Sequence, residues 1–400
     1  MRHLQTPEAR QLAGVEEPVI WVDASSSAAL STSAPDRSEV TSGDPLRVIH
    51  LIKHCGYGNG NVHVAVDLAC VQADAGYQVT VVSAGGTFEP LLDKHKVRHI
   101  RLNHDQSGPL SVLKASWKLV RYVRNMKADI LHAHMMSSAL VGYVVSKLTG
   151  VPLITTVHNS FDRHSIIMRL GHRVVAVSRA EREYLLSRGF ASDRVDVVMN
   201  APVMSPRESF MKDEVQPSIS SPCITTVCGL HRRKRVFDLI AACGMLFADM
   251  PRWHLYIAGE GPDLEALKEQ ARAAGIEANV VFLGFVRDPM PLLRQSDIFA
   301  LASESEPFGL SVAEARAAGC AIVATNVGGI PEVLDYGRAG RLVPPGRPDE
   351  LASELRDLMT NQEVRLQMQR SALSGSENFH VHRLVGDYES VYRRAHGRVG

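Results

Sequence analysis

The sequence lacks a long apolar run, closely paired cysteines and a large net charge, which are typical of membrane, metal-binding and nucleic-acid-binding proteins respectively. Its 400 residues contain no run of about 18 apolar residues, so no membrane-spanning helix is predicted. Its six cysteines never form a C-x-x-C pair, which argues against a zinc site or a disulfide framework and favours reduced thiols. A formal net charge of +1 gives no global electrostatic reason to expect a nucleic-acid partner. We therefore expect a cytoplasmic protein that does not bind nucleic acid.

The first 45 residues lack an apolar core and any clear period. They are rich in Ala, Ser, Thr and Pro, and residues 24–33 come close to low complexity. Because this stretch carries acids and no apolar h-region, we expect a flexible extension and not a secretory signal. Only residues 19–22 could pack, and their docking on the domain or on a partner is the less favoured alternative.

After the extension, strands and helices alternate. Residues 48–52 and 78–83 read as strands that flank a helix over 62–75, which makes a parallel βαβ unit. The full length predicts two or three domains. Further strands are expected over 129–134, 152–158, 174–178, 195–200, 224–227, 253–258, 279–283, 297–302, 321–325 and 341–343. Further helices are expected over 111–126, 141–148, 180–188, 236–250, 263–274, 313–318, 350–359 and 381–394. This alternation indicates an α/β protein.

The most informative stretch is residues 303–332. It holds Glu306 and Glu314, eight positions apart. Glu306 falls in a loop at the carboxyl end of a strand, where open α/β sheets bind ligands. The helix that opens at Ser311 would offer free backbone N–H groups to a phosphate or a sugar oxygen. Two carboxylates in one loop–helix unit could therefore bind sugar and ribose hydroxyls.

A purely structural interpretation of both acids stays open. Ser311-x-x-Glu314 also matches a capping box, in which Glu314 would only satisfy the start of the helix. Glu306 could be a solvated loop acid. The local pattern alone does not decide between these interpretations.

The stretch resembles the E-x7-E signature of retaining glycosyltransferases of the GT-B fold, in particular family four (glycosyl transferases group 1). The resemblance runs from about residue 47 to the C-terminus. It implies an α/β protein with two Rossmann-like domains facing across a cleft. It also implies that Glu306 contacts the donor sugar and that Glu314 binds the nucleotide ribose. Three positions would present backbone to the sugar and phosphate: Phe308, Gly309 and Leu310.

A cationic octapeptide, CGLHRRKR, lies between a strand and the start of a helix. Such a loop suits a diphosphate, although a charge run is more often a solvated face. The resembled family has G-R-L and then K-G here. Lys234 matches the family lysine, whereas Gly229 replaces the usual arginine and Arg235 replaces the usual glycine. Either Arg233 or Arg232 substitutes for the missing arginine, or the donor geometry differs.

Glycines in two other loops are candidates for close backbone approach to a ligand. Gly58 and Gly60 follow the first strand, but their loop fails the G-x-G-x-x-G fingerprint because His63 stands at its last position. In the resembled family this loop approaches the donor diphosphate from the opposite domain. Gly259 and Gly261 resemble the family's A-G-x-G-P element near the nucleotide.

Histidines mark the ends of two strands. His158 lies just beyond the carboxyl end of the strand over 152–158, where a ligand is expected, although a lone histidine is more often structural. The resembled family has a histidine here that contacts the donor sugar or the reaction centre. His132 and His134 are further candidates, unless they only pack in their strand.

A helix over 111–126 carries Trp117 and several cations, which fit contact with an anionic membrane surface or, as we favour, a solvated basic face.

The predicted domain organisation follows from these patterns and the resemblance. The boundaries are 1–45 for the extension, 46–200 for an acceptor domain, 201–222 for a linker, 223–380 for a nucleotide-sugar domain and 381–400 for a helix that crosses back to the first domain.

The predicted function is sugar transfer from a nucleotide-diphosphate sugar, most simply a UDP- or GDP-sugar, with retention at the anomeric carbon. The acceptor would be a glycan, a lipid-linked or a small molecule, with peripheral contact at the inner membrane surface as one possibility. Catalysis would rest on Glu306, His158 and Lys234, with no cofactor and no metal, since no D-x-D motif occurs. The alternatives are a non-hydrolysing sugar-nucleotide epimerase and a degenerate nucleotide-sugar-binding protein.

Overall fold

A computed structural model describes residues 45–103, 109–210 and 217–397 of the protein. The predicted N-terminal extension lies outside these residues, apart from its last position. Across the described ranges, no helix combines the length and the apolar character needed to span a bilayer.

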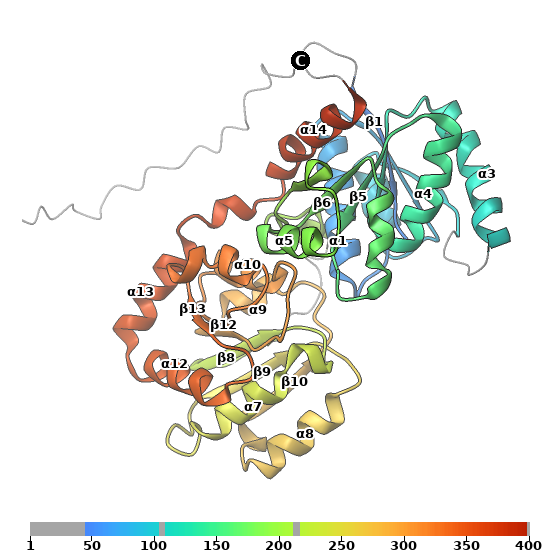
Figure 1. The fold of residues 1–400 in the computed structure, drawn as a ribbon. Helices are drawn as coiled ribbons and strands as arrows, with labels where there is room; N and C mark the ends of the chain where they lie inside the picture. The colour runs from blue at the N-terminus through green and yellow to red at the C-terminus, as the bar shows by residue number, and fades with distance from the viewer. Residues whose placement is uncertain (1–44, 104–108, 211–216, 398–400) are drawn as a thin grey trace, which may run out of the picture. The chain divides into compact units, whose positions relative to one another are not determined.

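The first sheet has seven parallel strands in the order β3-β2-β1-β4-β5-β6-β7 (Figure 1). Its strands are β1 (Arg47–Leu51), β2 (Gln78–Ser83), β3 (Arg98–Arg101), β4 (Ile130–Ala133), β5 (Leu153–Val157), β6 (Arg173–Ala176) and β7 (Val195–Val197). Its helical segments are α1 (Gly60–Asp74), α2 (Glu89–Lys94), α3 (Pro109–Asn125), α4 (Met136–Thr149), η2 (Arg163–Leu170), α5 (Arg179–Ser187) and η3 (Ser192–Arg194).

Both faces of this sheet are covered by helices, as parallel sheets require. Successive residues of β1 belong to different cores: Val48 packs with side chains of α1, and Ile49 packs with those of α3 and α4. The predicted first βαβ unit is confirmed, although its helix begins at Gly60, two residues earlier than expected. Asn59 caps α1, because its side chain accepts a hydrogen bond from the Asn61 N–H at 2.9 Å.

The second sheet has six parallel strands in the order β10-β9-β8-β11-β12-β13. Its strands are β8 (Cys223–Val227), β9 (His254–Ala258), β10 (Val280–Gly284), β11 (Ile298–Leu301), β12 (Ala321–Thr325) and β13 (Arg341–Val343). Its helical segments are η4 (Arg232–Lys234), α7 (Val236–Gly244), α8 (Leu264–Ala273), η5 (Glu277–Asn279), α9 (Met290–Arg294), α10 (Leu310–Ala318), α11 (Ile330–Val333), η6 (Asp335–Gly337), α12 (Pro348–Thr360), α13 (Gln362–Leu373) and η7 (Ser376–Phe379).

Two segments join the sheets in sequence or in space. The short helix α6 (Pro206–Phe210) lies in the stretch 201–222, where the sequence predicted no regular structure. The C-terminal helix α14 (Arg383–His396) follows the second sheet in sequence but lies beside the first sheet (Figure 1). Its Tyr388 and Tyr392 belong to a core shared with β1, β4 and β5. Side chains of α14 therefore reach the middle of the first sheet.

Candidate active site

Glu306 lies in the loop after β11, and its carboxylate is nearly enclosed. Only 7% of the residue is exposed, and Oε1 accepts a hydrogen bond from Ser303 Oγ at 2.8 Å. The Lys234 ammonium forms an ion pair with the same oxygen. A carboxylate that is removed from water needs such partners. The interpretation of Glu306 as a solvated loop acid is therefore wrong.

Two of the four predicted cations converge on Glu306. Lys234 pairs with it directly, and Arg233 Nη1 lies 3.9 Å from Glu306 Oε2 while it donates to the Ser305 carbonyl at 2.7 Å. The Arg233 guanidinium also lies 4.8 Å from the ring centre of Phe161, which is three residues beyond His158 in the sequence. Arg233 thus lies beside Glu306, and its proposed substitution for the missing arginine stays a prediction.

Arg235 has a different environment from its two neighbours. Its Nε donates to Asp238 Oδ2 at 2.6 Å, so its charge is already paired within the start of α7. Its backbone has a φ of 48°, in the left-handed region that glycine adopts most readily. A glycine would adopt this conformation without strain.

Glu314 lies on α10, half-buried among other acids. Burial raises the pKa of Glu314 to about 8, and the positive charge of Arg207 acts in the opposite direction. Arg207 itself is buried and holds Asp67 of α1 in a bidentate ion pair, with Nη2 at 2.8 Å from Oδ2. Burial and the neighbouring carboxylates therefore disfavour the charged form of Glu314, and a ligand hydroxyl could provide a hydrogen-bonding partner.

The predicted capping box is wrong. The N-cap of α10 is Gly309, with a φ of 97° and no side-chain cap, so Ser311 is already the second residue of the helix. The left-handed turn at Gly309 starts the helix earlier than the sequence pattern suggested. Phe308 is buried against Phe379, with ring centres 6.1 Å apart, so its backbone alone could face a ligand.

The predicted glycines fall into two structural groups. A side chain at Gly259 would overlap the Cys228 carbonyl, and one at Gly261 would overlap the Leu230 carbonyl. These two glycines let their loop pack against the loop that leads to Lys234. A Cβ atom on Gly60 would meet the side chain of Leu310, so these two predicted residues lie next to each other.

Gly58 stands apart from both groups. It adopts a φ of 86°, and a Cβ atom placed on it would find open space. The backbone conformation alone favours glycine here, because a side chain would be strained without being crowded. The structure therefore leaves room for a ligand beside this residue but does not require one.

His158 lies at the end of β5, against a cavity of about 420 Å³. It is 8% exposed, and its Nε2 lies 3.1 Å from His134 Nδ1, while its Nδ1 is buried without a hydrogen-bonding partner. Burial lowers the pKa of His158 to about 3, so the ring is neutral at physiological pH. Lys53, Asn59, Asn61 and Asn159 are among the polar residues that line the same cavity.

Sequence reasoning missed one histidine of this group. His50 of β1 lies 3.0 Å from His134 through Nδ1 and Nε2, and it is the register partner of His132 in the parallel pairing of β1 with β4. The signal was present, since polar residues in buried strands are uncommon. It could not be used without knowing that β1 and β4 are neighbours.

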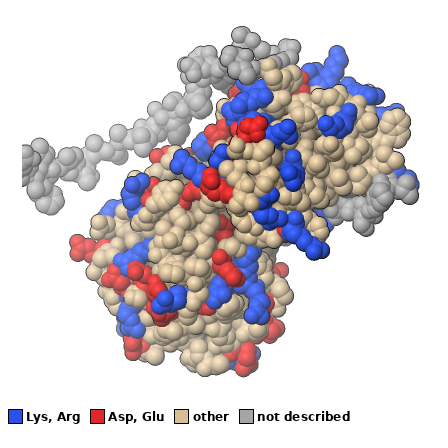
Figure 2. Space-filling model, viewed as in Figure 1, with Lys and Arg blue, Asp and Glu red and all other residues tan. Residues whose placement is uncertain are grey.

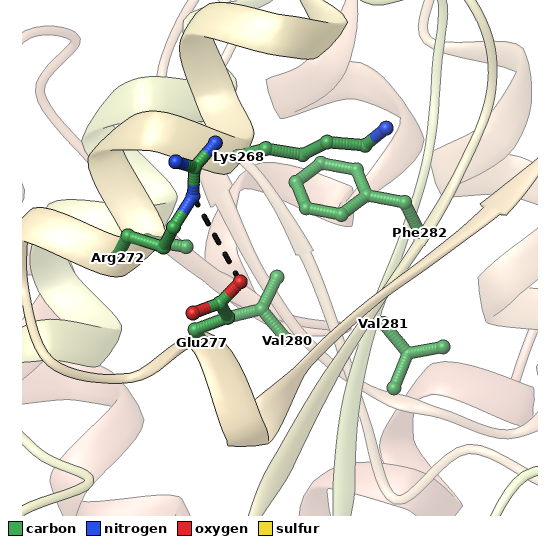
Figure 3. A pocket seen from close by; sticks show the side chains of 7 residues that line it. Lys268, Arg272, Glu277, Val280, Val281 and Phe282 are labelled. Carbon is green, nitrogen blue, oxygen red and sulfur yellow. Dashed lines mark ion pairs between the residues drawn. The ribbon is translucent and has the colours of Figure 1, made fainter.

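Another pocket in the described part of the chain, of about 510 Å³, lies between α8 and β10 (Figure 3). An ion pair between Arg272 and Glu277, 3.8 Å apart, closes one side of it. None of the predicted site residues lines this pocket. On the face shown in Figure 2, basic and acidic side chains are interspersed, in agreement with the near-zero net charge.

Comparison with known proteins gives consistent matches over most of the chain. The family described as Glycosyl transferases group 1 matches residues 211–374, and Glycosyltransferase Family 4 matches residues 58–201. A D-inositol 3-phosphate glycosyltransferase of Paenarthrobacter aurescens is 30% identical over an alignment of 300 residues, and the match covers 67% of this chain and 73% of that protein. The N-acetyl-alpha-D-glucosaminyl L-malate synthase of Bacillus anthracis is 27% identical over 364 residues, 83% of this chain and 93% of that protein.

A solved structure has the same fold. The Anabaena protein HepE, in complex with UDP and glucose, superposes with a TM-score of 0.74 at 22% identity. The match covers 87% of this chain and 100% of the HepE chain. The two parallel sheets described above are therefore the two halves of a GT-B fold.

Proposed function

Because the chain belongs to the glycosyl transferases group 1 and is a glycosyltransferase of the GT-B fold, we propose that it takes its sugar from a nucleotide-diphosphate donor and retains the anomeric configuration. One observation carries the proposal. Lys234, Arg233 and Glu306 converge at the carboxyl end of β11, beside the N-terminus of α10. This arrangement offers cations for a diphosphate and an acid for sugar hydroxyls.

The leaving diphosphate requires the largest electrostatic stabilisation. Lys234 and Arg233 would bind its oxygens, and the first N–H groups of α10 have no partner within the helix and could join them. A phosphate of the donor would replace Glu306 as the partner of the Lys234 ammonium. The Glu306 carboxylate would then be free to bind sugar hydroxyls. In this proposal the protein cations do the work of a metal ion.

Glu314 would bind the ribose of the donor. Its raised pKa means that the carboxyl is largely protonated near neutral pH before the donor binds. A protonated carboxyl can both donate and accept a hydrogen bond, which suits a pair of vicinal hydroxyls. UDP is the favoured nucleotide, because the HepE structure holds UDP and glucose, and GDP is the alternative.

We propose a small molecule as the acceptor. Two relatives are named for L-malate and for D-inositol 3-phosphate, which are small hydroxyl-bearing anions. These names favour a small acceptor over a glycan or lipid-linked one. The cavity beside His158 is of a size suited to a small molecule, and it is lined by Lys53, Asn59 and Asn61.

Contact with a membrane surface is a separate proposal with its own observation. The helix α3 exposes Trp117 at 65% and Leu113 at 59%, with Lys114 and Lys118 also exposed. An aromatic side chain among cations suits an anionic bilayer. In a sedimentation assay with anionic vesicles, we expect the wild type to bind and Trp117→Ser to lose binding. Equal binding of the wild type and the variant would reject this contact.

The function is tested by incubating the protein with UDP-, GDP- and ADP-sugars and measuring thermal shift together with nucleotide release. A shift with release for one donor, undiminished by EDTA, supports a metal-independent transferase. The anomeric configuration of the product, read by NMR, then tests retention. A shift without release, with candidate acceptors such as L-malate and inositol phosphate present, would favour the binding-protein alternative. Conversion of the donor sugar without an acceptor would favour the epimerase.

A further inference from the structure

A chain of buried polar side chains runs from the cavity to the C-terminal helix. It starts at His158, whose Nε2 meets His134 Nδ1 at 3.1 Å, and continues from His134 Nε2 to His50 Nδ1 at 3.0 Å. His50 Nε2 then meets Gln72 Oε1 at 2.8 Å, and Gln72 Nε2 donates to Tyr392 Oη at 3.2 Å. All five residues are buried.

The amide of Gln72 gives this chain a direction. Its nitrogen donates to Tyr392, so its oxygen is the atom that faces His50. An amide oxygen can only accept a hydrogen bond, so His50 Nε2 must carry the proton. A neutral imidazole has one N–H group and one acceptor nitrogen, and His50 Nδ1 is therefore an acceptor.

The direction of donation is the same at each ring in turn, because a neutral imidazole donates through one nitrogen and accepts through the other. Burial lowers the pKa of His50 to about 4 and that of His158 to about 3, and the pKa of His134 also lies well below its ordinary value. His50 accepts from His134 Nε2–H, and His134 Nδ1 then accepts from His158 Nε2–H. The last acceptor in the chain is His158 Nδ1, the buried nitrogen that has no partner in the protein.

A second arm takes its direction from the same Gln72 amide. Tyr392 Oη, which accepts from Gln72, lies 2.8 Å from His132 Nδ1 and can donate its own proton there. His132 Nε2 lies 2.7 Å from Thr156 Oγ1, which in turn lies 3.1 Å from Tyr388 Oη. If the Gln72 amide turned over, every bond in both arms would reverse, and His158 Nδ1 would become a donor.

We propose that Gln72 and Tyr392 are positioning residues that hold His158 as the Nε2–H tautomer, so that Nδ1 accepts a hydrogen bond from a hydroxyl group of the sugar substrate. This inference rests on the proposed function for the role of His158, but the tautomer itself does not. The C-terminal helix thereby determines which ring nitrogen of His158 carries the proton. The substrate hydroxyl would be the last donor in the hydrogen-bonded chain.

A metal ion is the other occupant that these histidines could hold. His50, His132 and His134 each place one ring nitrogen within 4.8 Å of the others. However, both ring nitrogens of all three already have hydrogen-bonding partners at 2.7–3.1 Å. A metal would have to break several of these bonds, so the hydrogen-bonded chain is favoured.

The test is ¹⁵N NMR of histidine-labelled protein, with matched variants one helical turn apart. The chain has 17 histidines, so the His158 signals are assigned by their loss in His158→Gln. In the wild type we expect the proton on Nε2 of His158. Tyr392→Phe releases the Gln72 amide and should mix the two tautomers, whereas Tyr388→Phe removes only the end of the second arm and should leave His158 unchanged.

The outcomes separate the tautomer from the proposed function. A proton on Nδ1 of His158 in the wild type, or a stoichiometric metal ion in the purified protein, would overturn the proposal. The tautomer measurement needs only His158→Gln to fold, for the assignment, and the metal analysis needs no variant. With UDP-glucose as donor, we expect Tyr392→Phe to lower kcat/KM about tenfold and Tyr388→Phe to change it less than twofold. If Tyr392→Phe mixes the tautomers of His158 but leaves nucleotide release unchanged, the hydrogen-bonded chain sets the tautomer and His158 does not act on the substrate.

Discussion

Replacement of Glu306 by glutamine should separate turnover from nucleotide binding. In the structure Glu306 pairs with Lys234, and the exposed fractions of the two side chains are only 8% and 15%. In the proposed donor complex, a phosphate would therefore compete with this carboxylate for the Lys234 ammonium. Glu306→Gln keeps the shape and the contact with Ser303 but removes the competing charge.

The magnitudes follow from the burial of this pair. Loss of one partner from a fully buried ion pair costs about 3–5 kcal/mol, and because Lys234 still reaches solvent we expect about 1–2 kcal/mol of lost stability. If the pair is worth about 1 kcal/mol, its removal should strengthen UDP binding by about fivefold. Turnover should fall by about tenfold or more, a barrier increase of about 1.4 kcal/mol or more, because the sugar loses its acid.

The assays are calorimetric titration with UDP and nucleotide release from a UDP-sugar. Glu304→Gln is the matched control, because Glu304 lies in the same loop and is exposed. Lys234→Ala should lower both UDP affinity and turnover. Near-normal turnover in Glu306→Gln and Lys234→Ala would remove both residues from the site, and weaker UDP binding in Glu306→Gln would refute the competition between carboxylate and phosphate.

Three further predictions concern stability. The native pKa of Glu314 is raised from 4.5 to about 8, so the native state holds a proton that the unfolded state loses, and stability should fall as pH rises from about 5 to 8. The Tm advantage of Glu314→Gln over the wild type should therefore grow across this range, and a constant difference would contradict the shift. Asp67→Ala leaves Arg207 buried without its carboxylate and should cost about 3–5 kcal/mol in urea unfolding, whereas a loss under 1 kcal/mol would show that water reaches the guanidinium. Deletion of residues 1–44 should leave the Tm unchanged, and a large decrease would show that the extension docks.

Several elements escaped prediction because their sequence patterns are weak. The strand β3 has only four residues, and α9 has five, so neither carries enough of a period to be read. The twelve-residue helix α13 was also missed, since it buries few of its side chains and its apolar face is narrow. The cap of α10 was misplaced because Ser and Glu at capping-box spacing also occur inside a helix.

The sequence alone determined the alternation of strands and helices, the first parallel βαβ unit, the loop with Glu306 and the cationic loop with Lys234, whereas the division into two sheets was an implication of the family resemblance. These features depend on local periodicity, on glycine and on the position of a loop after a strand, all of which are written in neighbouring residues. The tertiary structure decided which side chains meet. Gln72 contacts Tyr392 across 320 positions, and Asp67 contacts Arg207 across 140. No local pattern encodes such pairs, because the order of the strands and the path of the last helix bring them together.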